Sequence, residues 1–136
     1  MLRRIALAFC LLGLAACWSS YADRARVHAE LLTLMADKLV ALVEVAAPPP
    51  IEGMGEYVYP AKRAHEFLTS YSGYAEYQSH RQLTELVTRY EALVRRIDAA
   101  RAGASDWSSQ IDGIRRENEE LHRIRGAVDQ SLESRR

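Results

Sequence analysis

The chain has 136 residues, and its 18 Lys and Arg residues balance its 18 Asp and Glu residues, so its formal net charge at pH 7 is zero. A near-neutral surface of mixed charge argues against nucleic-acid binding, which requires clustered positive charge. The length is enough for one small domain with a single hydrophobic core.

The first 16 residues have the pattern of an export signal. Arg3 and Arg4 give a positive start, an apolar run follows, and two alanines stand at its end. A membrane-spanning helix needs about 20 consecutive apolar residues, and charges from Asp23 onward follow this run too soon for that length. We therefore expect residues 1–16 to be a cleaved signal peptide.

The segment Leu14-Ala15-Ala16-Cys17 resembles the lipobox of bacterial lipoproteins. In that family the cysteine is acylated and becomes the first residue after cleavage. The resemblance covers residues 1–17, and it implies lipidation of Cys17 and attachment to a membrane. Cys10 lies in the segment that would be removed, so Cys17 would have no disulfide partner within the chain. The open alternative is an ordinary signal peptide in which Cys17 falls at the junction by chance.

Trp18 directly follows the cysteine. In enteric bacteria an Asp at this position tends to retain a lipoprotein in the inner membrane, so the resemblance implies the outer membrane, with a domain that faces the periplasm. Removal of residues 1–16 would leave 120 residues, of which 16 are basic and 18 acidic. We expect residues 17–22 to form a lipid-anchored linker and residues 23–136 to form a helical domain.

The first predicted helix of this domain spans residues 23–47. Its apolar side chains, Val27, Leu31 and Leu34 among them, recur every three or four positions, as in an amphipathic helix. Ser20 and Asp23 have the spacing of a capping box, which would start the helix there. Three prolines at positions 48–50 must end it, because proline lacks an amide proton. An ordered loop is then expected over residues 48–60.

Two further helical stretches follow, at residues 61–102 and 106–133. A break is expected near Gly73, because glycine costs about 1 kcal/mol relative to alanine inside a helix. Residues 74–102 and 106–133 are similar in length and are joined by a short turn, which predicts an antiparallel helical hairpin at the C-terminal end. The expected fold is therefore all-α, an up-down bundle of three long helices, or of four if the second breaks near Gly73.

Two pairs of side chains are candidates for a partner surface. Tyr57 and Tyr59 stand on the predicted loop, and tyrosine contributes a large contact area at interfaces. Asn118 and Arg125 occupy apolar positions of a heptad seam, where a polar residue can fix helix register or face a partner helix. For Asn118, an intramolecular hydrogen bond across the bundle is the open alternative.

A denser aromatic segment surrounds the predicted break near Gly73. We expect Phe67, Tyr71 and Tyr74 to cap the core at one end of the bundle, because large aromatic side chains are mostly buried. A ligand cavity lined by these rings is the alternative.

The sequence offers little for catalysis. Glu119 and His122 have the Glu-x-x-His spacing of di-iron bundles, but such a site needs a second copy and two further glutamates. None of His28, His65 or His80 follows an acidic residue by three positions, so we expect no metal and no cofactor. No nucleophile elbow, P-loop or dinucleotide-binding glycine motif is present, and we do not expect an enzyme.

The expected function is a lipid-anchored interaction protein that faces the periplasm, an accessory or assembly factor of a bacterial envelope complex. Its partners would be the membrane and an envelope protein, with self-association left open. Pilotins of secretion pores, and the exclusion lipoproteins of conjugative elements and phages, are similar in size and anchoring. An exclusion lipoprotein of a mobile element is therefore one alternative, and a lipoprotein that binds a small apolar ligand or lipid between its helices is another.

Overall fold

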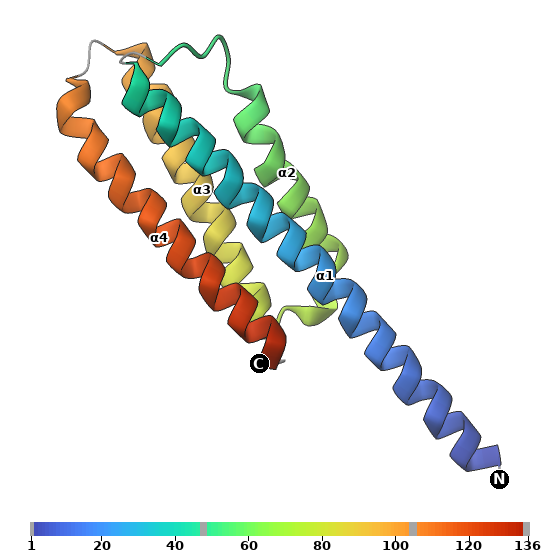
Figure 1. The fold of residues 1–136 in the computed structure, drawn as a ribbon. Coiled ribbons are helices and arrows are strands. Elements are labelled where there is room, and N and C mark those ends of the chain that lie inside the picture. Colours follow the sequence, from blue (N-terminus) through green and yellow to red (C-terminus); the bar gives the residue numbers. More distant parts are fainter. Residues whose placement is uncertain (1, 47–48, 104–105, 135–136) are drawn as a thin grey trace.

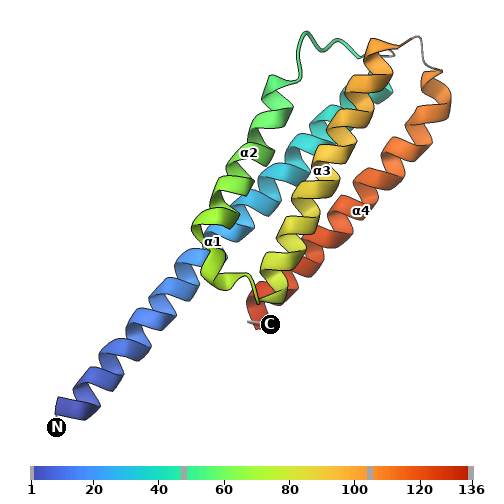
Figure 2. The ribbon, with the colours of Figure 1, turned by 180° about the vertical axis from the view of Figure 1, so that it is seen from behind.

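The computed structural model describes residues 2–46, 49–103 and 106–134. Its helices are α1 (Leu2–Val45), α2 (Gly55–Ser70), the short 3-10 helix η1 (Ser72–Tyr74), α3 (Gln78–Ala102) and α4 (Trp107–Ser134). The described residues contain no strand, so the expected all-α class is confirmed. Figures 1 and 2 show the four long helices side by side, with α1 and α3 running in one direction and α2 and α4 in the other.

The break expected near Gly73 is present, and the described residues therefore form four long helices rather than three. α2 ends at Ser70, and the amide of Tyr71 bonds to the carbonyl oxygen of Phe67 at 3.0 Å. η1 and a turn then reverse the chain before α3 begins. Among the described residues, no helix combines the length and the hydropathy that a membrane crossing requires.

The loop predicted over residues 48–60 is wrong for its second half, because α2 begins at Gly55. Tyr57, Pro60, Ala61 and Ala64 are buried on one face of α2, at the three- and four-residue spacing of a helix. The side chains of residues 56–59 alternate in a way that would also fit a short extended segment, but burial of this face favours the helix. Pro60 is the sixth residue of α2, so its missing amide proton removes one backbone hydrogen bond of the helix, and its burial shows that packing offsets this loss.

The predicted linker at residues 17–22 and the predicted helix start at Asp23 are also wrong. α1 runs from Leu2 through this region without a break, and Asp23 forms an i,i+3 ion pair with Arg26 at 3.7 Å instead of capping an end. No proline interrupts α1 before its end. Figure 1 shows the N-terminal part of α1 extending beyond the rest of the bundle.

The face that α1 buries differs from the predicted stripe. Val27 and Leu34 are each 61% exposed, whereas Ala25, Ala29 and Ala36 are fully buried. α1 packs against all three other helices. Alanine side chains allow the helices to approach closely, and larger side chains of the same helix, such as Leu32 and Leu39, are also buried in the core.

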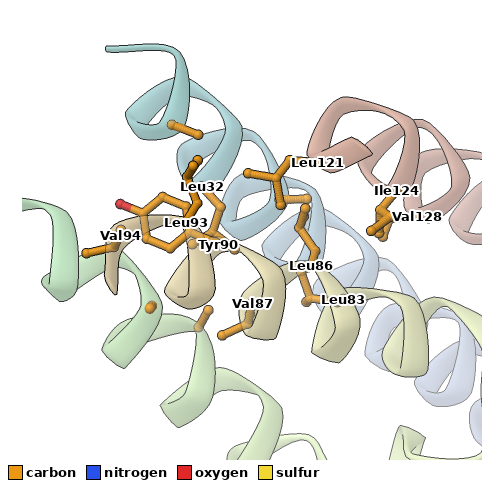
Figure 3. Packing of buried hydrophobic residues seen from close by; sticks show 14 of the residues in the cluster. Leu32, Leu83, Leu86, Val87, Tyr90, Leu93, Val94, Leu121, Ile124 and Val128 are labelled. Atoms are coloured by element: carbon orange, nitrogen blue, oxygen red, sulfur yellow. The ribbon is translucent and has the colours of Figure 1, made fainter. Parts of the chain in front are cut away.

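The core is apolar and contains side chains from all four helices (Figure 3). α3 contributes a wide apolar face, and burial of each leucine-sized side chain contributes about 1.5–3 kcal/mol. The labelled core residues in Figure 3 are Leu32 of α1, Leu83, Leu86, Val87, Tyr90, Leu93 and Val94 of α3, and Leu121, Ile124 and Val128 of α4.

Candidate functional site

One end of the bundle carries a cluster of aromatic side chains where α1 leaves the other helices. α1, α2, η1 and the turns on either side of η1 all contribute to it. We call this cluster the aromatic end, and it consists of Trp18, Tyr21, Phe67, Tyr71, Tyr74 and Tyr77.

Tyr21 is the centre of the aromatic end and is fully buried. Its ring stacks on Tyr74, with centroids 4.3 Å apart and an interplanar angle of 5°, and lies 5.7 Å from Phe67. Its hydroxyl is 3.3 Å from the Oγ atom of Ser79 on α3. Burial raises the pKa of Tyr21, and the hydrogen bond to Ser79 opposes this only in part. The expectation that Phe67, Tyr71 and Tyr74 cap the core at one end is confirmed.

The rim of the aromatic end remains accessible and lies beside Cys17. Trp18 is partly buried, and its ring centroid lies 5.1 Å from that of Tyr77 and 6.0 Å from that of Tyr74. Tyr77 is 37% exposed, and Cys17 is exposed on α1 immediately before Trp18. The proposed lipidation site and the aromatic rim therefore occupy the same end of the bundle.

Asn118 and Arg125 form a polar seam between α4 and α1. Asn118 Nδ2 donates a hydrogen bond to Asp37 Oδ1 at 2.8 Å, and Arg125 Nη1 donates one to Thr33 Oγ1 at 3.3 Å. Both candidate partner residues thus have partners within their own chain. This arrangement matches the intramolecular alternative that was left open for Asn118.

Asp37 is the centre of this polar seam. His122 Nε2 lies 2.7 Å from the same Oδ1 atom that Asn118 contacts. Partial burial raises the pKa of Asp37, but the hydrogen bonds from Asn118 and His122, with the charges of His122 and Arg125, outweigh it and hold the pKa below its ordinary value. The seam therefore contains an ionised carboxylate at neutral pH.

Tyr57 and Tyr59 lie on opposite sides of α2. Tyr57 is 3% exposed, so its prediction as a surface residue is wrong, and its carbonyl oxygen accepts a hydrogen bond from the Tyr90 hydroxyl at 2.5 Å. Tyr59 is 59% exposed, and its neighbour Val58 is exposed as well. The helical start of α2 explains the difference, because two positions along a helix turn a side chain to the far side.

Val58 also lines an open groove between α2 and α3, with a volume of about 680 Å³. His65 of α2 and Glu91 of α3 are joined across the groove by a contact of 2.7 Å between Nε2 and Oε1. This groove was not predicted from the sequence, because residues 48–60, which include Val58, were expected to form a loop. The lining residues are Val58, Ala61, Lys62, His65, Glu66, Thr69, Ser70 and Glu91.

His122 of the Glu-x-x-His pair on α4 belongs to the polar seam, because its Nε2 atom contacts Asp37. Within the described residues, no three His, Cys, Asp or Glu side chains lie close enough together to hold a metal ion. No protein-family model, curated protein or solved structure matches this chain.

Proposed function

We propose that the chain is a lipid-anchored, periplasm-facing interaction protein of the bacterial envelope, an accessory or assembly factor that holds a partner at the membrane. The observation that carries this proposal is the position of Cys17. Among the side chains that the structure describes, core packing begins with Trp18 and Tyr21. Cleavage before Cys17 and acylation of its thiol would therefore leave the described core complete.

The proposal places the partner away from the anchor. We take the bundle to be an up-down arrangement, in which α2 begins at the end opposite Cys17. The paths of α1 and α2 in Figure 1 support this arrangement. Val58 and Tyr59 lie near that start, and about half of each side chain is exposed beside the α2–α3 groove. Exposed apolar side chains next to a groove are typical of a docking surface.

Substitution of Cys17 tests the anchor. We expect Cys17→Ala to release the protein from membranes in a fractionation experiment, because the acylated residue is lost. Cys10→Ala is the matched control, since Cys10 lies in the predicted signal peptide, and it should leave attachment unchanged. A Cys17→Ala protein that stays fully in the membrane fraction would overturn the anchor. Density-gradient separation of the two membranes tests the proposed outer-membrane location.

Site-specific photo-crosslinking tests the partner surface. We expect a photoreactive side chain at Tyr59 to crosslink an envelope protein in the native host. Arg116, which is exposed on α4, is the control position and should give no such product. Equal amounts of crosslinked product from both positions would show that the α2 surface is not the partner surface. Crosslinks only between copies of this chain would show self-association instead of binding to another envelope protein.

A further inference from the structure

We propose that the aromatic end is a membrane-contact surface, whose rim of Trp18, Tyr74 and Tyr77 rests in the headgroup region of the bilayer that holds Cys17. This inference rests on the proposed lipidation of Cys17. It adds an interaction surface and an orientation of the bundle, which the anchor alone does not determine.

The anchor and the bundle are separated by only a short distance along the chain. α1 is continuous from Cys17 to Tyr21, which is the first fully buried side chain among those that the structure describes. Four residues of helix rise by about 6 Å, whereas the predicted six-residue linker could extend over roughly 20 Å. A helix in place of a linker therefore holds this end of the bundle against the membrane surface.

The side chains of the rim have the chemistry of a membrane interface. Trp18, Tyr74 and Tyr77 come from α1, η1 and the turn before α3, so they form a surface across the end of the bundle. Tryptophan and tyrosine have an apolar ring and a polar hydrogen-bonding group, and they are enriched where membranes meet water. The nearby exposed charges of Glu76 and Arg81 have opposite signs, so the contact depends on the rings more than on net charge.

Lipid fits the rim of the aromatic end better than a protein or a small ligand does. A protein partner at this surface would have to fit between the bundle and the bilayer, into which Cys17 would insert its acyl chains. A small apolar ligand would need an apolar cavity, but the Tyr21 and Tyr74 rings stack directly on each other and Tyr21 is fully buried. The pocket beside Phe67 and Tyr71 is lined mostly by charged and polar side chains. The phospholipid interface is the occupant that the position of the anchor supplies.

The consequence is a defined orientation of the bundle. If the aromatic end rests on the membrane, the long helices point away from it, and the 25 residues of α3 span about 38 Å in that direction. The start of α2, with Val58 and Tyr59, is then presented well above the headgroups. The membrane contact would thus set the height and the direction of the proposed partner surface.

Tryptophan quenching by brominated phospholipids tests the contact. Trp18 adjoins Cys17 and would report anchoring alone, so the reporter is Tyr77→Trp in a protein that also carries Trp18→Phe and Trp107→Phe. The control is native Trp107 in a Trp18→Phe protein, because Trp107 begins α4 at the opposite end of the bundle. Each full-length protein is expressed with lipidation and reconstituted in phosphatidylethanolamine and phosphatidylglycerol vesicles with bromine on the upper acyl chains.

We expect the indole at position 77 to lose a large share of its emission and Trp107 to keep its emission. Acylated protein whose emission is quenched no more at position 77 than at Trp107 would overturn the membrane contact and leave the anchor intact. An unacylated intact mass would instead overturn the anchor, so the two failures are distinguishable. Ala75→Trp, at an exposed position of the same turn, is the second reporter if Tyr77→Trp does not fold.

Discussion

Different interactions stabilise the two ends of the bundle. At the aromatic end, rings from α1, α2 and η1 pack around the fully buried Tyr21. At the opposite end, Lys38 Nζ meets Glu56 Oε1 at 2.5 Å with both side chains exposed, and the Arg101 guanidinium donates to the carbonyl oxygen of Ile51. Buried rings stabilise strongly, whereas exposed ion pairs contribute little. We infer that the ring contacts of the aromatic end stabilise the fold more than these exposed contacts do, although buried side chains such as Tyr57 also contribute at the opposite end. The aromatic end is the one that we place against the membrane.

The largest expected effect on this comparison comes from Tyr21→Ala. It removes the buried ring at the centre of the aromatic end, and we expect a loss of about 3–5 kcal/mol in the free energy of unfolding. Urea denaturation followed by circular dichroism measures this change. Tyr77→Ala is the control on the exposed rim. Equal losses for the two variants would contradict the central place of Tyr21.

Tyr90→Phe has the next largest effect. It removes the buried hydroxyl that donates to the Tyr57 carbonyl oxygen and so joins α3 to the first turns of α2. We expect a loss of about 1–1.5 kcal/mol in the free energy of unfolding, again by urea denaturation. Tyr71→Phe removes a hydroxyl whose contact with Ser20 is long, at 3.4 Å, and exposed. If Tyr71→Phe were the more destabilising variant, the role of the Tyr90 hydrogen bond would be wrong.

Acid is expected to weaken the aromatic end in particular. Burial lowers the pKa of His80, and burial, with the charges of Arg63 and Arg24, lowers the pKa of His28. The His28 ring lies 4.9 Å from that of Phe67, and the His80 ring 6.3 Å from that of Tyr21. In the unfolded chain these histidines have the ordinary pKa of about 6.5, so below that pH the unfolded state binds more protons than the folded state. The contribution of the two histidines to stability is therefore complete above about pH 6.5 and is lost as the pH falls toward their lower folded-state pKa values.

Thermal unfolding at about pH 7.5 and about pH 5.5 measures this effect. We expect the melting temperature to fall on acidification, and to fall less in a protein with His28→Gln and His80→Gln together. His65→Gln removes an exposed histidine from the α2–α3 groove and serves as the control. An unchanged acid response in the double variant would show that other groups cause it.

The smallest effect is expected from Lys38→Gln at the opposite end. It removes the exposed ion pair with Glu56, and we expect no measurable change in the urea midpoint, because solvent and salt screen such a pair. A loss as large as that of Tyr90→Phe would mean that the two ends do not differ in the way inferred above.

Much of the helical framework follows from the sequence. The three- and four-residue spacing of apolar side chains predicted the long helices, and the helix-weakening residues around Gly73 predicted the break between α2 and α3. The start of α2 at Gly55 was not predicted. The nearby prolines and the alternating side chains of residues 56–59 are typical of a loop with a short extended segment, and only burial shows that one face of these residues is helical. The continuity of α1 through residues 17–22 was missed because a capping-box spacing is a local signal that also occurs inside helices.

The candidate sites depend on contacts between distant parts of the chain, and these were harder to predict. Asn118 was identified as a polar residue in a seam, but its partner Asp37 lies 81 positions earlier. The aromatic end was anticipated from Phe67, Tyr71 and Tyr74, while the contribution of α1 was not. Tyr21 lies four positions before Ala25 on the same helical stripe, and that register is the signal that could have placed its ring in the core.

The most direct test of the central claim is the intact mass of the protein extracted from membranes of its native host. We predict a chain that begins at Cys17 and carries the added mass of acyl chains on that cysteine. A chain that retains residues 1–16, or one that is cleaved there without acylation, would contradict the lipid anchor and the membrane orientation built on it.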